Sequence, residues 1–240
     1  MNRLKIFAVT AFFGALFMAS QLIGEEHLQD GMLGLTMEAI HGKLGMPTHY
    51  YLEEIPYRRY WLYPVEEASQ VEPKFWADPA IPRDEMFPIE KAGKKLLYRV
   101  QYAWDKSQPQ AVQKVKKYWV YLKENPVELA DLASVVGEFA SGVKADVLCF
   151  KNRQINTNRT IVTFLLPETS ELAGIIANNF REPADTNQWG VSYEVILCDG
   201  EEDVSLKSKV YEVIIGPGSK RRLLGFKKLG YNEIVSPFSS

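Results

Sequence analysis

The sequence predicts an α+β fold in which short helices pack on a three-stranded antiparallel sheet, followed by a second α+β unit. Three observations favour this fold: a short capped helix at residues 36–45, alternating aromatic strands within residues 58–123, and further helix and strand patterns after residue 125. With 46% hydrophobic and 24% charged residues, the composition is that of a globular protein. We expect one domain at residues 28–124 and a second at residues 125–235.

The chain begins with a basic segment, residues 1–5, followed by 18 largely apolar residues, 6–23. Small residues close this stretch, so residues 1–24 have the pattern of a secretory signal peptide. We therefore expect a periplasmic or secreted protein. If the leader is not cleaved, residues 6–23 associate with the membrane and anchor the chain in the inner membrane, because 18 residues is the lower limit for a spanning helix.

Residues 36–45 form the clearest helix in the sequence. Thr36 is a good N-cap, and Leu35 with Ile40 fits a hydrophobic staple. Gly45 suits the end of the helix because glycine tolerates a positive φ, and Pro47 cannot continue it. We expect this helix to cover the first sheet.

Residues 96–104 alternate between two sets of side chains, which is typical of a strand with one buried face. Residues 58–63 and 116–123 share the aromatic and β-branched character of strands. These segments make up the expected three-stranded sheet. The intervening residues 64–95 contain five prolines, so we expect an irregular insertion there.

The second unit shows helical spacing of apolar residues at 127–139 and again at 170–180. Strands are expected at residues 145–151, 160–166, 191–198, 209–215 and 222–229.

The run from Gly34 to Pro47, together with Trp61 and Tyr63, resembles the SmpA/OmlA (BamE-like) domain of bacterial envelope proteins. It is also similar in shape to repeats of the β-lactamase inhibitory protein. The resemblance implies a module that works through protein contacts without catalysis, as in outer-membrane assembly. A secreted inhibitor of an enzyme shares the same shape.

Charge and motifs exclude several other classes of function. Without the leader the chain has 26 basic and 30 acidic residues, which argues against a nucleic acid partner. Its three histidines, His27, His41 and His49, form no metal-binding pattern, and no serine-nucleophile motif is present. We expect no catalytic site, metal or cofactor. The alternative is a secreted or periplasmic hydrolase that acts on envelope polymers through carboxylates.

Cys149 and Cys198 are the only cysteines, and both lie in strand-like runs. In an oxidising compartment they could form a disulfide. The alternative is a pair of thiols that behave as small apolar side chains.

Aromatic residues are concentrated in residues 50–121, which hold 15 of the 29. Within each expected strand they occupy both parities, so some must face outward unless the second unit covers that face. Outward aromatic and arginine side chains are typical of protein interfaces. We expect these residues to bind an envelope protein or another envelope component: Trp61, Tyr63, Arg99, Trp119 and Tyr121.

Overall fold

The computed structural model describes residues 31–54, 59–65, 84–91, 93–105, 107–136, 148–154, 159–167, 189–198, 200, 203–219, 223–225, 228 and 233–234. The leader at residues 1–24 and the helix expected at residues 170–180 lie outside these ranges. Within them, no helix is long and apolar enough to cross a membrane.

The described residues form one antiparallel sheet of eleven strands, in the order β11-β7-β8-β9-β10-β5-β4-β3-β1-β2, with β6 paired to β10. Nine strands are long: β1 (His49–Glu54), β2 (Arg59–Pro64), β3 (Asp84–Lys91), β4 (Lys94–Ala103), β5 (Lys114–Tyr121), β7 (Leu148–Gln154), β8 (Arg159–Pro167), β9 (Trp189–Leu197) and β10 (Lys209–Ser219). Two have only two residues: β6 (Val127–Glu128) and β11 (Glu233–Ile234).

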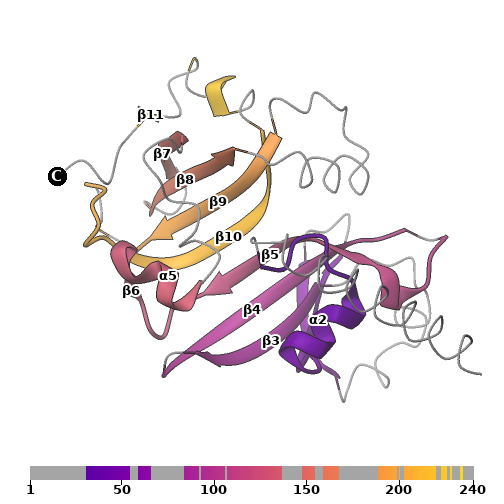
Figure 1. The fold of residues 1–240 in the computed structure, drawn as a ribbon. Coiled ribbons are helices and arrows are strands. Elements are labelled where there is room, and N and C mark those ends of the chain that lie inside the picture. Colours follow the sequence, from indigo (N-terminus) through magenta and orange to yellow (C-terminus); the bar gives the residue numbers. More distant parts are fainter. Residues whose placement is uncertain are drawn as a thin grey trace, which may run out of the picture.

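Helical structure is limited among these residues. The named segments are α2 (Met37–Leu44), α5 (Leu132–Val135) and the 3-10 turns η1 (Gln110–Val112) and η2 (Leu129–Asp131). Figure 1 shows α2 lying over β3, β4 and β5, whereas α5 and β6 lie beside β10 and the end of β5.

The predicted fold class is therefore wrong. β4 and β5 pair as expected, but β1 and β3 lie between β2 and β4, and β10 pairs with the other side of β5. A sheet that ended at β5 would leave its backbone donors and acceptors unpaired along that edge. β10 pairs with this edge, so the second half of the chain enlarges the first sheet.

The proline-rich insertion also contains a strand that we did not expect. β3 lies in the segment 64–95 and pairs with β4 along its whole length. The backbone amide of Thr48 donates to the carbonyl of Met86, so Met86 points its backbone groups toward β1. Pro88, two residues on, has the same orientation but lies beyond the part of β3 that β1 pairs with. Its missing N–H therefore costs the sheet no hydrogen bond.

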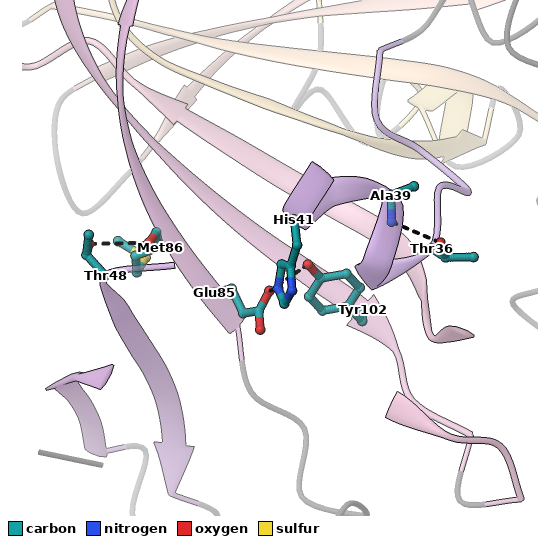
Figure 2. Close-up of polar contacts among 7 residues, drawn as sticks. All are labelled: Thr36, Ala39, His41, Thr48, Glu85, Met86 and Tyr102. Atoms are coloured by element: carbon teal, nitrogen blue, oxygen red, sulfur yellow. Dashed lines mark hydrogen bonds and ion pairs between the residues drawn. The ribbon is translucent and has the colours of Figure 1, made fainter. Parts of the chain in front are cut away.

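The predicted capped helix is confirmed. α2 starts after Thr36, whose hydroxyl accepts a hydrogen bond from the amide of Ala39 at 3.2 Å (Figure 2). Gly45 ends it with a φ of 83°, a conformation that glycine adopts at little cost. Ile40 is fully buried and Leu35 packs against the same core.

The second half of the chain agrees less closely with the sequence-based prediction. Strands β7 to β10 occur near four of the predicted positions. One long helix was expected at residues 127–139, but residues 127–135 form β6, η2 and the four-residue α5, and residues 137–139 lie outside the described ranges. Val127 pairs with Val210 of β10, and the amide of Leu129 donates to the carbonyl of Ser208. This pairing supplies backbone partners that a helix would have found internally. Leu223 to Gly225 are helical, not part of the strand expected at 222–229.

Both halves share a single hydrophobic core on the face of the sheet that α2 covers, which we call the inner face. Its strand residues include Tyr98, Val100, Val120, Phe164, Tyr193, Val195, Val213 and Ile215. Val120 and Val213 are directly paired although they lie on opposite sides of the expected domain boundary at residues 124 and 125. Sheet and core thus continue across that boundary.

Candidate functional site

The candidate site lies on the outer face of the sheet, opposite α2. Along β4 and β5 buried residues alternate with half-buried ones, and the half-buried set on β4 and β5 includes Arg99, Trp119 and Tyr121. Glu212 of β10 is paired with Tyr121 and belongs to the same face. The side chains of neighbouring strands that share a face are close enough to interact.

Arg99 is the centre of this surface. Its guanidinium carbon lies 3.7 Å from the centroid of the Tyr51 ring and 4.1 Å from that of the Trp119 ring. Nε donates to Oδ2 of Asp84 at 2.6 Å, and the Arg99 side chain is only 14% exposed. We call Tyr51, Asp84, Arg99, Trp119 and Tyr121 the Arg99 cluster. Cation–π contacts and a charge-assisted bond hold its members together.

Electrostatics keep Arg99 charged within the cluster. Burial alone would lower the pKa of Arg99, but the charge of Asp84 and hydrogen bonds to Asp84 and Tyr121 outweigh it, so the pKa is raised. Burial raises the pKa of Tyr121, although the hydrogen bond from Arg99 opposes this. The phenol of Tyr121 therefore stays neutral and accepts from the guanidinium.

A second group of charges adjoins the cluster on β8, β9 and β10. Burial raises the pKa of Glu212. The positive charges of Arg159, Arg99 and Lys117 act to lower this pKa, whereas the negative charge of Glu194 acts to raise it further. Arg159 lies over the ring of Tyr211 at 4.1 Å, and Lys117 Nζ lies 5.2 Å from the Trp119 ring. Basic, acidic and aromatic side chains from both halves of the chain thus share one surface.

Buried residues limit this surface on one side. On β8 and β9, several positions of the outer face are buried: Thr163, Leu165, Ser192 and Ile196. A Cβ added to Gly218 would lie 2.6 Å from Cβ of Ser192 and 2.8 Å from Cδ1 of Leu165, so backbone packs tightly there. The half-buried part of the face is accordingly centred on β4, β5 and β10.

Three of the five residues expected to bind a partner come together in the Arg99 cluster: Arg99, Trp119 and Tyr121. The register places Trp61 and Tyr63 elsewhere. Tyr63 pairs with Tyr50, which pairs with Glu85, and Glu85 pairs with Val100 of the inner face. Trp61 shares the parity of Tyr63 in β2. These two positions therefore belong to the opposite face, and one surface does not hold all five.

The sequence did not point to Tyr51, Asp84 or Glu212 as members of the site. Tyr51 and Asp84 lie near Arg99 only because β3 pairs with β4 and β1 pairs with β3, and the proline-rich insertion concealed β3. Glu212 lies beside Tyr121 because β10 pairs with β5. Asp84 and Glu212 could be read from the sequence as acidic residues, but the strand order that brings them to this face could not.

A buried polar contact joins α2 to the inner face. His41 Nε2 lies 2.8 Å from Oε2 of Glu85, and the hydroxyl of Tyr102 donates to the same oxygen at 2.7 Å (Figure 2). Glu85 is 1% exposed, and its Oε1 has no hydrogen-bond partner among the described residues. The contact positions α2 on the sheet, since His41 reaches across from the helix to β3.

The two cysteines are not joined by a disulfide. Cys149 on β7 is buried and pairs with Phe164 of β8, whereas Cys198 directly follows β9. β8 lies between the two strands, and Cys149 is in register with Tyr193, five positions before Cys198. Burial raises the pKa of the Cys149 thiol to about 12, so it behaves as an apolar side chain.

No group of three or more histidine, cysteine, aspartate or glutamate side chains in the described part of the chain could hold a metal ion. Comparisons with family models, curated proteins and solved structures found no match for the chain.

Proposed function

We propose that this chain is an exported, non-catalytic protein that binds an envelope protein through the outer face of its sheet. The leader at residues 1–24 supports the location. The Arg99 cluster is the single observation that carries the binding role. It sets Trp119 and Tyr121, held by a paired arginine, on a face that none of the described strands of the second half stacks against.

The composition of this face supports a protein partner. Trp, Tyr and Arg are the residue types that contribute most to binding energy at interfaces, especially when they are partly desolvated. Arg99 already bonds to Asp84 and Tyr121, so it costs little further conformational entropy when a partner covers it. A rigid aromatic surface of this kind favours docking over induced fit.

Truncation of the two aromatic side chains tests the proposal. Trp119→Ala combined with Tyr121→Ala in the full-length chain should weaken partner capture after crosslinking in native envelopes, by roughly thirtyfold in affinity for about 2 kcal/mol. Met46→Ala with Val112→Ala is the matched control, because both side chains are exposed and apolar but lie outside the cluster. Undiminished capture by a folded double variant of the cluster would refute the proposal.

The second candidate function is a hydrolase that acts on envelope polymers. One observation favours it: Glu212, whose pKa burial raises, lies near Glu194, and carboxylates with different environments can act as acid and base. Release of soluble fragments from purified peptidoglycan, abolished by Glu212→Gln, would favour this candidate. Turnover that survives the substitution would contradict the role of Glu212, and an absence of turnover in the wild type would contradict the hydrolase candidate.

A further inference from the structure

The β3–β4 hairpin carries two lysines directly opposite each other at its end. Lys91, the last residue of β3, is paired with Lys94, the first residue of β4. Lys91 is exposed and Lys94 is half-buried. Like charges directly opposite each other destabilise a strand pair, so this arrangement has a cost for the fold.

Two further lysines lie at the same end of the sheet. Lys95 follows Lys94 in β4, and Lys123 lies two residues beyond the end of β5; both are exposed. The side-chain amide of Asn125 donates to the carbonyl of Lys95 at 3.4 Å, which places the turn after β5 beside the hairpin (Figure 1). We call this group the lysine end: Lys91, Lys94, Lys95 and Lys123.

The charges of the lysine end are not neutralised within the described part of the chain. Glu90 and Glu124 are the acidic residues of the two segments concerned, residues 88–95 and 122–126. Four lysines against two glutamates leave an excess of two positive charges, although the whole chain has a formal charge of -2. None of the four lysines forms an ion pair within 4.0 Å with a residue that the structure describes. An anionic surface is therefore the complementary partner.

We propose that the lysine end binds the anionic headgroups of a membrane surface, a contact separate from the outer face and beyond the proposed function. The residue types favour a membrane over a protein. Residues 88–95 and 122–126 contain no arginine and no aromatic residue, and lysine is depleted at protein interfaces. Attraction to anionic lipid needs only point charges on flexible stems close to the surface, which lysine supplies. Headgroup phosphates next to Lys91 and Lys94 also offset the repulsion between these two side chains.

Sedimentation with lipid vesicles tests the proposal on the full-length chain. Vesicles of phosphatidylcholine mixed with phosphatidylglycerol should bind the wild type more tightly than vesicles of phosphatidylcholine alone, and added salt should weaken this preference. Lys91→Gln combined with Lys94→Gln should lower the partition onto the anionic vesicles by roughly twenty-five-fold, at about fivefold for each lysine. Lys95→Gln combined with Lys123→Gln is an independent second variant and should weaken binding by a similar factor. The leader is the same in every variant, so its own contribution cancels in the comparison.

Lys114→Gln combined with Lys116→Gln is the matched control. Both side chains are exposed and lie at the other end of β5, a strand of eight residues that spans about 25 Å. This distance exceeds the screening length of about 10 Å. The control removes the same charge and should bind the anionic vesicles as the wild type does.

The outcomes separate folding, lipid binding and protein binding. Urea unfolding of the variant of Lys91 and Lys94 should show a stability equal to or above that of the wild type, because the like-charge pair is removed. Trp119→Ala combined with Tyr121→Ala should keep vesicle binding, so failure of one proposal leaves the other intact. A wild type without preference for anionic vesicles overturns the inference, and so does a folded variant of Lys91 and Lys94 that binds them as tightly as the wild type.

Discussion

Arg99 acts as a positioning residue at the scale of single side chains. Its guanidinium lies between the rings of Tyr51 and Trp119, and it bonds to Asp84 on β3. Gln101 also donates to Asp84, at 3.3 Å, so the carboxylate is held from two positions of β4. Arg99 therefore fixes the aromatic rings in place, and in the proposed complex the partner contacts the rings more than the guanidinium.

Replacing Arg99 with lysine should destabilise the protein although the charge is kept. Lysine has no planar group to lie between two rings and cannot bond to Asp84 through two nitrogens. We expect a loss of about 1.5–3 kcal/mol in the free energy of unfolding, measured with urea, because a buried charged hydrogen bond is weakened. Lys117→Arg is the control and should change stability by less than about 0.5 kcal/mol. Equal stability of R99K and the wild type would contradict this role.

Replacing Glu212 with glutamine should stabilise the protein at neutral pH. Burial raises the pKa of Glu212, so the folded protein binds this proton more tightly than the unfolded chain does. Wild-type stability from this group therefore rises as the pH falls through the raised pKa, and the two proteins converge near the ordinary glutamate pKa. Urea unfolding at several pH values measures the gap. A gap that widens on acidification would show that the sign is wrong.

At the scale of elements, features that depend on neighbouring residues in the chain were predicted correctly more often than features that depend on long-range strand pairing. The ends of α2 were predictable because capping depends on neighbours in the chain, here Thr36 and Gly45. β4 and β5 were predictable from alternation, which is also local. The prediction of one helix at residues 127–139 was wrong because the same apolar spacing also fits short segments, one of which pairs with β10.

Two alanine substitutions in the α2 region should have opposite effects. Gly42 is an exposed helical residue and a Cβ there meets no atom within 4 Å, so Gly42→Ala should stabilise by about 0.5–1 kcal/mol. Gly45 also has open space, but its φ of 83° and ψ of −167° suit only glycine, so Gly45→Ala should cost about 1–3 kcal/mol. Thermal unfolding followed by circular dichroism gives both values. The same sign for both would contradict the cap assignment.

At the scale of the whole molecule, the order of the strands could not be predicted from the sequence. The alternation of β4 and β5 identified Arg99, Trp119 and Tyr121 as outward residues, but it could not show that β3 and β10 are their neighbours. Parity within β2 likewise could not be related to parity in β4 without the pairings through β1 and β3. For this reason the sequence could not show that the backbone positions of Trp61 and Tyr63 are in register with inner-face positions of β4.

The continuous sheet gives the site its extent. Because β10 pairs with β5, charges from β8, β9 and β10 adjoin aromatic rings from β1, β4 and β5 on one face. Separate domains would have divided these groups between two surfaces. Among the described residues, α2, α5 and the shared core occupy the inner face, and the proposed binding surface is the opposite face.

Site-specific photo-crosslinking in native envelopes tests the binding face most directly. Photoreactive residues are placed one at a time at Leu97 and Ile214 on the outer face, and at Glu38 and Met46 beside the inner face, all of which retain some exposure. We predict crosslinks to a common neighbouring protein from Leu97 and Ile214 and none from Glu38 or Met46. Crosslinks from the α2 side alone would contradict the account.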